Sequence, residues 1–341
     1  LGMIEDIEID GSKVSFKLVL TTPACPMKEK MKNDCEKAIQ SRVDPYAEVI
    51  IEMTSRTSSR RKNDDTMLKG VKNIIAVVSG KGGVGKSTVS ANLAVALAKL
   101  GAKVGLLDAD IYGPSVPLLF DLVNARPSAR EVDGRTILEP IEKYGIKLLS
   151  IGFFVDPNKA LVWRGPMASN YLTQMLTGGD WGELDYLVID MPPGTGDIHL
   201  TLVQTVPVTG AAIVTTPQEV ALADARKAYN MFTTDSIKVP VLGLVENMAW
   251  FTPAELPENK YYIFGKEGGK RFAEEIGAPL LGQIPLVQSI CESGDSGNPV
   301  AALDDSSPVA LAFRQLAESV AQQIAIRNAN LDPTQIVEIK S

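Results

Sequence analysis

The sequence predicts an α/β fold with a doubly wound, mostly parallel sheet, preceded by a small α+β domain. After residue 70, short and continuously apolar runs recur, which indicates strands covered on both faces. Helix-length segments separate these runs, and such crossovers connect parallel strands. A polar stretch before residue 70 separates the two domains. The expected strands are 74–78, 104–107, 148–151, 187–189, 211–215 and 241–245, and the expected helices include 88–100 and 218–233.

Length, composition and charge limit the class of protein. The 341 residues favour two domains over one, since a domain has about 150 residues. Apolar residues make up 45% and charged residues 22%, which excludes a disordered, collagen-like or disulfide-stapled protein. The net charge of −7 argues against nucleic acid as a partner, because its phosphate backbone is bound by an excess of lysine and arginine. Three cysteines and one histidine are too few for a disulfide framework or a zinc site within one chain.

The sequence also predicts no membrane partner. No apolar run approaches the roughly 18 residues that a membrane helix requires. Residues 1–10 are acidic and lack the apolar segment of a signal peptide, and the residues from Asn328 onward form no basic amphipathic helix. We therefore expect a cytoplasmic protein.

The N-terminal part of the chain alternates between strand-like and helix-like patterns. Residues 13–20 and 47–53 are expected to be strands, and residues 26–40 a helix with Pro26 in its first turn. Residues 54–68 are polar and lack apolar periodicity, which is typical of a linker. The expected parts of the chain are a small α+β domain (1–54), a linker (55–69), a main domain (70–327) and a C-terminal tail (328–341).

The segment between the first apolar run and the next helix has the sequence GKGGVGKST. It matches the phosphate-binding pattern G-x-x-x-x-G-K-[ST] in the strand–loop–helix context that this pattern requires, which disfavours the alternative of a glycine-rich turn without a ligand. The glycines let backbone N–H groups approach phosphate oxygens at a helix N-terminus. Lys86 is expected to contact the β- and γ-phosphates of ATP, Ser87 to bind Mg²⁺, and Thr88 to contact the α-phosphate. The expected nucleotide-binding residues of this loop are Gly80, Lys81, Gly82, Gly83, Val84, Gly85, Lys86, Ser87 and Thr88.

Aspartates follow two other apolar runs. Asp108 and Asp110 follow residues 104–107, and Asp190 follows residues 187–189, so these carboxylates are expected at the ligand-binding edge of the sheet. Asp190 has the position of a Walker B acid, which holds Mg²⁺, usually through water. Asp108 is expected near the same metal shell. The alternative for Asp108 and Asp110 is a pair of loop acids that cap the next segment.

Three further features lie near the expected nucleotide. The segment Gly194–Gly196 follows two prolines and is expected to place a backbone N–H near the γ-phosphate, in a switch that senses hydrolysis. His199 is interpreted as a structural hydrogen-bonding residue rather than a ligand. Asn247 follows the run 241–245, and its amide offers a donor and an acceptor to the adenine edge, although an Asx turn explains its spacing equally well.

The loop sequence KGGVGKST resembles the deviant Walker A motif of the class that includes MinD, ParA and the nitrogenase iron protein. The resemblance implies a homodimer with two facing ATP sites, in which Lys81 stabilises phosphate charge in the partner's site; on spacing alone Lys81 is a solvated charge. It also implies that Asp110 orients the attacking water, and it favours a nucleotide contact for Asn247. Lys81, Lys86 and Asp110 are therefore the expected catalytic residues.

A larger set of segments resembles the Mrp/ApbC group of iron–sulfur cluster carrier ATPases, over about residues 70–325. These segments are SGKGGVGKST, LLDADIYGPSVP, DYLVIDMPPGTGD, GLVENM, FGKEGG and LGQIPL. The residues LTTPACPMK are similar to part of the small domain that precedes the ATPase in many of these proteins. Its usual first helix is missing, so we expect this domain to be incomplete at its N-terminus. The resemblance implies a labile 4Fe-4S cluster, with apo iron–sulfur proteins or cluster-assembly factors as partners.

The sequence departs from this group at the expected cluster ligands. Such carriers usually have Cys-x-x-Cys shortly after Glu-Asn-Met, so that two chains supply four thiolates, but residues 249–269 contain no cysteine. Cys25 and Cys35 would lie about 15 Å apart along one helix, too far apart for one cluster. Cys25 precedes Pro26 at the expected helix start, where the helix dipole favours thiolate, so it is the preferred thiol. Cys291 is expected as a second ligand if the small domain folds back over the ATPase domain; the alternative is that these thiols are simply packed or exposed.

These observations predict a slow, homodimeric, Mg²⁺-dependent ATPase that acts in iron–sulfur cluster assembly or transfer. One alternative is a MinD/ParA-like positioning ATPase, which would need a membrane-targeting tail or a basic DNA surface. Another is an ATP-gated binding scaffold with little turnover. A nitrogenase-type reductase is set aside, because it requires paired cluster cysteines within the ATPase domain.

Overall fold

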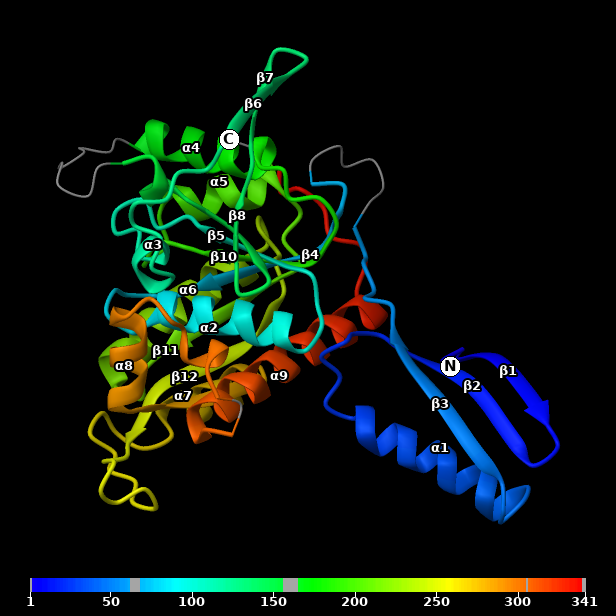
Figure 1. Ribbon diagram of the computed structural model, residues 1–341. Coiled ribbons are helices and arrows are strands. Elements are labelled where there is room, and N and C mark those ends of the chain that lie inside the picture. The colour runs from blue at the N-terminus through cyan, green and yellow to red at the C-terminus, as the bar shows by residue number, and fades with distance from the viewer. Residues whose placement is uncertain (1, 62–67, 156–164, 305, 339–341) are drawn as a thin grey trace.

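The computed structural model describes residues 2–61, 68–155, 165–304 and 306–338. Residues 62–67 of the expected linker and 339–341 of the expected tail therefore lie outside the described residues. A small N-terminal sheet is followed by an eight-stranded main sheet with helices on both faces (Figure 1). This arrangement confirms the predicted fold class. Within the described ranges, no helix is long and apolar enough to cross a membrane.

The small domain pairs three strands with one helix. Its elements are β1 (Ile4–Asp10), β2 (Lys13–Leu20), α1 (Lys28–Arg42) and β3 (Glu48–Ser55). β2 is antiparallel to β1 and parallel to β3, as the crossover through α1 requires. Phe16, Leu18 and Leu20 alternate along β2 and form the buried centre of this domain. The expected strand 13–20 is confirmed, whereas β1 was not expected.

Two boundaries in the small domain correct the sequence analysis. The helix begins at Lys28 with Met27 at its N-cap, because the residues before Met27 form a turn in which the Lys28 N–H donates to the carbonyl of Cys25. Pro26 is therefore not in the helix, and the expected action of the helix dipole on Cys25 loses its basis. β3 continues through Ser55, into the expected linker, because it keeps pairing with β2.

The main sheet has the strand order β13-β12-β11-β4-β10-β5-β9-β8. Its strands are β4 (Val71–Val78), β5 (Val104–Asp108), β8 (Ile141–Lys143), β9 (Ile146–Ser150), β10 (Leu184–Asp190), β11 (Gly210–Thr215), β12 (Val241–Phe251) and β13 (Leu280–Leu286). Neighbours are parallel except for β8, which is antiparallel to β9. All expected strands of this sheet are found, whereas β8 and β13 are additional. The carboxyl ends of the parallel strands share one edge, and a ligand site is expected there.

Helices cover both faces of this sheet. They are α2 (Lys86–Lys99), α3 (Val116–Leu119), α4 (Gly165–Gly178), α5 (Asp197–Thr205), α6 (Glu219–Thr233), α7 (Gly268–Ile276), α8 (Gln288–Asp295) and α9 (Pro308–Asn330), with short 3-10 turns at Ile151–Phe153 and Val300–Ala302. A hairpin of β6 (Ala129–Val132) and β7 (Arg135–Leu138) stands apart from the sheet. α2 and α9 share one buried cluster with the sheet, and α4, α5 and α6 share the other.

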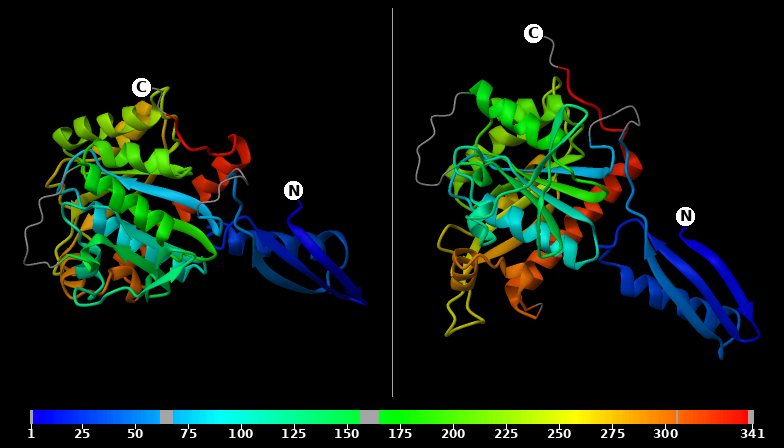
Figure 2. Two further views of the ribbon diagram at one scale, coloured as in Figure 1. Left: turned by 90° about the horizontal axis from the view of Figure 1, so that it is seen from above. Right: turned by 45° about the horizontal axis from the view of Figure 1, so that its top comes forward.

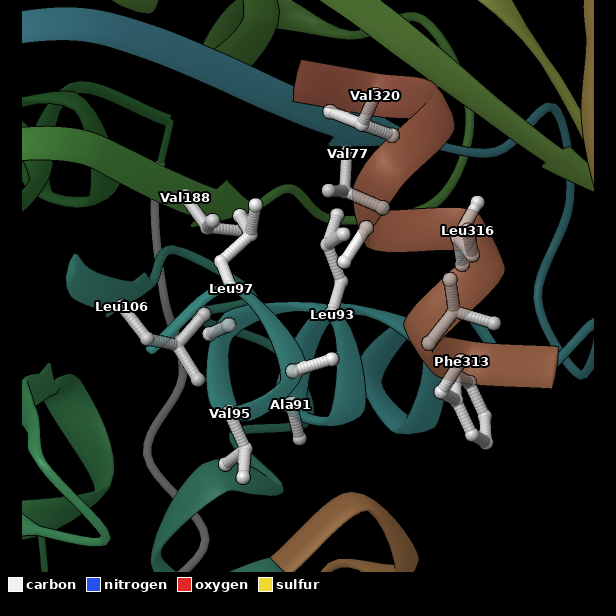
Figure 3. Close-up of a cluster of buried hydrophobic side chains, with 14 of the residues drawn as sticks. Val77, Ala91, Leu93, Val95, Leu97, Leu106, Val188, Phe313, Leu316 and Val320 are labelled. Carbon is white, nitrogen blue, oxygen red and sulfur yellow. The ribbon is translucent and has the colours of Figure 1, made fainter. Parts of the chain in front are cut away.

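Helix α2 is held firmly against the sheet. Figure 3 shows Leu93 and Leu97 of α2 directed toward Val77 of β4 and Val188 of β10, with α9 alongside. All four side chains are fully buried or nearly so. Burying one such side chain stabilises a fold by about 1.5–3 kcal/mol, so the N-terminus of α2 has a fixed position relative to the strand ends.

The small domain extends to one side of the main domain (Figure 2). The hydroxyl groups of Thr22 and Tyr186 lie 2.8 Å apart and join the segment after β2 to β10. In the expected linker, the carbonyl of Ser58 accepts hydrogen bonds from Asn73 and Asn328. Asn328 is buried within α9, which continues to Asn330, so the expected C-terminal tail begins too early.

Candidate functional site

The loop between β4 and α2 has a backbone path that requires glycine. Gly83 and Gly85 have φ values of 80° and 78°, a region that side chains with a Cβ rarely adopt. A Cβ at Gly85 would lie 2.2 Å from Nδ2 of Asn247, and one at Gly80 would lie 2.1 Å from the backbone of Asp224. The expected nucleotide loop is therefore closely packed against β12 and α6 at both of its ends.

The loop leads directly into α2. Gly85 is the N-cap of α2 and offers no side chain to the first N–H groups of the helix. These unpaired N–H groups and the helix dipole favour an anion at this position. The Ser79 hydroxyl donates to the carbonyl of Lys81, and the Gly194 N–H donates to the carbonyl of Ser79. The Gly194 N–H therefore donates to a group of the protein itself, the carbonyl of the residue that directly follows β4.

The structure brings Lys86, Asp110 and Asp190 together behind the loop. The Nζ atom of Lys86 lies 2.8 Å from Oδ1 of Asp190, 3.6 Å from Oδ2 of Asp110 and 3.2 Å from the Ser87 hydroxyl. Lys86 is only 6% exposed. Residues from the loop, from the end of β5 and from the end of β10 thus form one charged cluster, as the strand-end positions in the sequence predicted.

This cluster contains more negative than positive charge. Asp108, Asp110 and Asp190 are all buried, and Lys86 is the cation with which Asp110 and Asp190 form ion pairs. Burial raises the pKa of Asp108 to about 7, and the neighbouring Asp190 carboxylate acts in the same direction. Burial also raises the pKa of Asp110, against the opposing effect of Lys86. A divalent cation would relieve this excess of buried carboxylate.

The residues fit Mg²⁺ at Asp190. Oδ2 of Asp190 is buried and has no hydrogen-bond partner, whereas Oδ1 accepts from both Lys86 and Ser90. Mg²⁺ prefers oxygen ligands and usually takes only one or two from the protein, completing its shell with phosphates and water. In the part of the chain that the structure describes, no cluster of three or more Cys, His, Asp or Glu side chains could hold a metal. The site therefore fits a metal ion that takes most of its ligands from a bound phosphate group and from water.

The hydrogen bonds of Asp108 are those of a capping residue. Oδ1 accepts from the N–H of Asp110, and Oδ2 accepts from the N–H of Val116 and from the Ser150 hydroxyl. Asp108 therefore fixes the loop that carries Asp110, and this geometry corresponds to the capping alternative for Asp108.

Asn247 contacts the loop rather than forming an Asx turn. Its Nδ2 atom donates to the carbonyl of Val84 at 2.8 Å, and the residue is 6% exposed. The adjacent Glu246 is fully buried, accepts from Gln283 at 2.7 Å and also accepts from the N–H of Gly269 at the start of α7. Through these bonds, Asn247 holds the glycine loop and Glu246 holds the start of α7. The long-range bond of Asn247 could not be found from spacing along the chain.

Lys81 and His199 have few polar contacts. Lys81 is partly exposed, and no ion pair joins its ammonium group to the described residues. The interpretation of His199 as a structural hydrogen-bonding residue stays a prediction. Burial lowers the pKa of its ring to about 4, against the opposing effect of the nearby backbone of Gly196, which acts on the ring as a hydrogen-bond acceptor and raises the pKa. The ring nitrogens are buried, and the ring also packs edge-on near Phe232, with centroids 6.3 Å apart.

The structure does not bring the candidate thiols together. Cys25 is partly exposed in the small domain, and Cys291 is exposed on α8. α8 lies on the side of the main domain away from the small domain (Figure 1). The small domain therefore does not fold back over α8, and within one chain Cys25 and Cys291 cannot share a cluster.

Sequence reasoning missed one further residue of the site. Ser90 is fully buried on α2, and its hydroxyl oxygen lies 2.7 Å from Oδ1 of Asp190. Its spacing was an available signal, because residues four apart lie on the same face of a helix and Ser90 follows Lys86 by four.

A glycine-rich loop between a buried strand and a helix, with a buried lysine and strand-end carboxylates, defines a P-loop nucleotide-binding protein. Residues 70–321 match the family described as NUBPL iron-transfer P-loop NTPase, and residues 1–52 match the family described as iron-sulfur cluster assembly protein. The chain belongs to the NUBPL iron-transfer P-loop NTPase family, and its small domain has the sequence of a cluster-assembly domain.

Relatives in several organisms support this assignment. An iron-sulfur cluster carrier protein of Synechocystis sp. is 47% identical over 96% of this chain and 92% of its own length. An iron-sulfur protein of Arabidopsis thaliana required for mitochondrial NADH dehydrogenase is 48% identical over 82% of this chain and 87% of its own length. Among solved structures, a nucleotide-binding protein from Archaeoglobus fulgidus in complex with ADP is 39% identical, with a TM-score of 0.61 over 72% of this chain and 96% of that chain. The MinD cell division ATPase of Pyrococcus furiosus, 23% identical with a TM-score of 0.51 over 73% of this chain and 98% of that chain, shows the fold alone.

Proposed function

We propose that this chain is a cytoplasmic, homodimeric, Mg²⁺-dependent ATPase of slow turnover that assembles iron–sulfur clusters or transfers them to apo-proteins. The convergence of Lys86, Asp110 and Asp190 behind the glycine loop carries the nucleotide part of this proposal. The family, and the relatives named as iron-sulfur cluster carrier proteins, support the cluster part.

In this proposal, the loop and α2 hold the phosphates. The N–H groups of residues 80–88 donate to phosphate oxygens, with Thr88 at the α-phosphate. Lys86 exchanges its bond to Asp190 for the β- and γ-phosphates, which its flexible side chain allows. Ser87 and Asp190 would hold Mg²⁺, which neutralises charge on the phosphate oxygens when it is bound. Asp108 stays beside this metal shell and fixes the Asp110 loop through its backbone hydrogen bonds.

Asp110 is proposed to act on the attacking water. Its carboxylate accepts a hydrogen bond from the water whose oxygen bonds to the γ-phosphorus, while the bridging oxygen leaves with ADP and the water's proton passes to phosphate. Lys81 reaches across the homodimer and offsets the charge that develops in the partner's site. Asn247 has a second amide hydrogen and a carbonyl oxygen left for the adenine edge.

Single-turnover hydrolysis of ATP tests this assignment. Asp110→Asn keeps the size of the side chain but weakens its acceptor strength, so we expect hydrolysis to fall by about 100-fold while ATP binding is retained. Asp133→Asn on the exposed hairpin is the matched control and is expected to behave as wild type. If the wild type binds ATP without hydrolysing it, the chain is an ATP-gated scaffold and the ATPase proposal fails.

A cluster-loading experiment tests the other half. Cys25 is the preferred thiol and Cys291 the other candidate, each of which would require ligands from a second chain. Wild type, Cys25→Ser and Cys291→Ser are reconstituted anaerobically with iron and sulfide, with Cys35→Ser as control, and bound iron and visible absorbance are measured. Loss of iron in Cys25→Ser alone supports the thiol assignment. A wild type that binds no iron contradicts the carrier role and leaves the ATPase proposal unaffected.

A further inference from the structure

The buried hydroxyl group of Ser90 is directed at Asp190. Its oxygen lies 2.7 Å from Oδ1 of Asp190 and 3.0 Å from the carbonyl of Lys86. Within a helix, the Lys86 carbonyl accepts the backbone N–H of Ser90. The hydroxyl group has a single hydrogen, and the carboxylate is both the nearer acceptor and the charged one, so the hydrogen bond to Asp190 is the stronger of the two.

The two oxygens of Asp190 have different surroundings. Oδ1 accepts from Ser90 and from Lys86, the latter at 2.8 Å, while Oδ2 is buried without a partner. Asp190 and Ser90 are both fully buried, so water does not readily replace either contact. A carboxylate fixed at one oxygen holds the other oxygen in a defined direction.

We infer that Ser90 is a positioning residue that orients Asp190 so that Oδ2 faces Mg²⁺, an inference that rests on the proposed nucleotide function. When Lys86 moves to the phosphates, Ser90 is the remaining donor to Oδ1 among the described contacts. Without Ser90, the carboxylate is free to turn and the metal loses a preorganised ligand. Partners that orient a ligand in this way contribute roughly 10- to 100-fold to metal affinity.

The competing interpretation is that Ser90 only donates to the Lys86 carbonyl, as many helix serines do. Mn²⁺ serves as a paramagnetic probe for the Mg²⁺ site, and its binding to the ADP-saturated protein is followed by electron paramagnetic resonance. The affinity for ADP without metal, measured in EDTA, reports the loop alone. We expect Ser90→Ala to weaken Mn²⁺ binding by about ten-fold or more and to leave metal-free ADP affinity unchanged.

Two variants test rescue, and one is a control. Ser90→Thr keeps the hydroxyl and is expected to restore Mn²⁺ affinity; Ser90→Cys keeps the size but donates weakly, so it is expected to be intermediate. Ser293→Ala, which removes a buried serine on α8 that donates to a carbonyl, is expected to match wild type.

Each outcome decides the inference. Wild-type Mn²⁺ affinity in Ser90→Ala, or an equal loss of metal-free ADP affinity, overturns the positioning role. If the wild-type ADP complex itself binds no Mn²⁺, the proposed metal site fails, and the role of Ser90 fails with it. If the wild type and Ser90→Thr bind Mn²⁺ and Ser90→Ala binds it at least about ten-fold more weakly with unchanged metal-free ADP affinity, both stand.

Discussion

Replacing Asn247 with alanine removes the side chain that holds the carbonyl of Val84. The hydrogen bond measures 2.8 Å, and Val84 is 2% exposed, so water does not readily substitute for the lost donor. Leaving a buried carbonyl unpaired costs about 1–3 kcal/mol. Because 1.4 kcal/mol corresponds to a factor of ten, we expect ATP affinity to fall by about ten-fold, with the loop less well ordered before binding.

The choice of nucleotide separates two roles for Asn247. If Asn247 mainly supports the loop, its loss affects the phosphate cradle, and the affinities for ATP and GTP fall by the same factor. If it mainly contacts the adenine edge, ATP affinity falls and GTP affinity does not. Titration of both nucleotides by fluorescence, with urea unfolding of the free protein, measures the two effects.

The control is Asn330→Ala, which removes another asparagine that donates to a carbonyl, near the end of α9. It is expected to bind both nucleotides as wild type does. A selective loss of ATP affinity in Asn247→Ala would refute the supporting role, as would unchanged binding of both nucleotides.

Three further predictions concern packing and pH. Burial lowers the pKa of His199 to about 4, so between about pH 6.5 and pH 4 the imidazole takes up a proton only in the unfolded chain. Over this range, urea unfolding should show that wild type loses about 3 kcal/mol more stability than His199→Leu. An equal loss in the two proteins would contradict this. Tyr186→Phe removes the bond to Thr22 and should lower the unfolding free energy by about 1 kcal/mol, with no change if the bond contributes nothing. Gly80→Ala places a Cβ 2.1 Å from the backbone of Asp224, so ATP titration should show weaker binding, and wild-type affinity would mean that the loop can shift without loss.

Much of the main domain was predictable, because buried parallel strands have continuously apolar sequences. The loop 80–88 was predictable for a different reason, since its backbone path requires glycine at Gly83 and Gly85 and phosphate binding requires a lysine at position 86. β13 was missed because Pro285 interrupts its sequence, and proline is tolerated there because β13 is an edge strand of the sheet. β1 was missed because its alternating acids resemble a solvated segment, and the strand is largely exposed.

The site was predictable only in part. Strand-end positions were sufficient to place Asp110 and Asp190 near Lys86, since parallel strands end at a common edge. The bond from Asn247 to Val84 and the packing of His199 near Phe232 depend on contacts between distant segments, which no local pattern encodes. The position of Cys25 before α1 was misjudged because proline permits either a helix start or a turn.

Strand β10 connects the residue that contacts the small domain to Asp190. Tyr186, which bonds to Thr22, precedes Asp190 by four residues, so at about 3.3 Å per residue they are about 13 Å apart. β10 is hydrogen-bonded on both sides, to β4 and β5, and therefore cannot stretch or slip. The contact between Thr22 and Tyr186, where the small domain meets the sheet, therefore keeps a constant separation from Asp190.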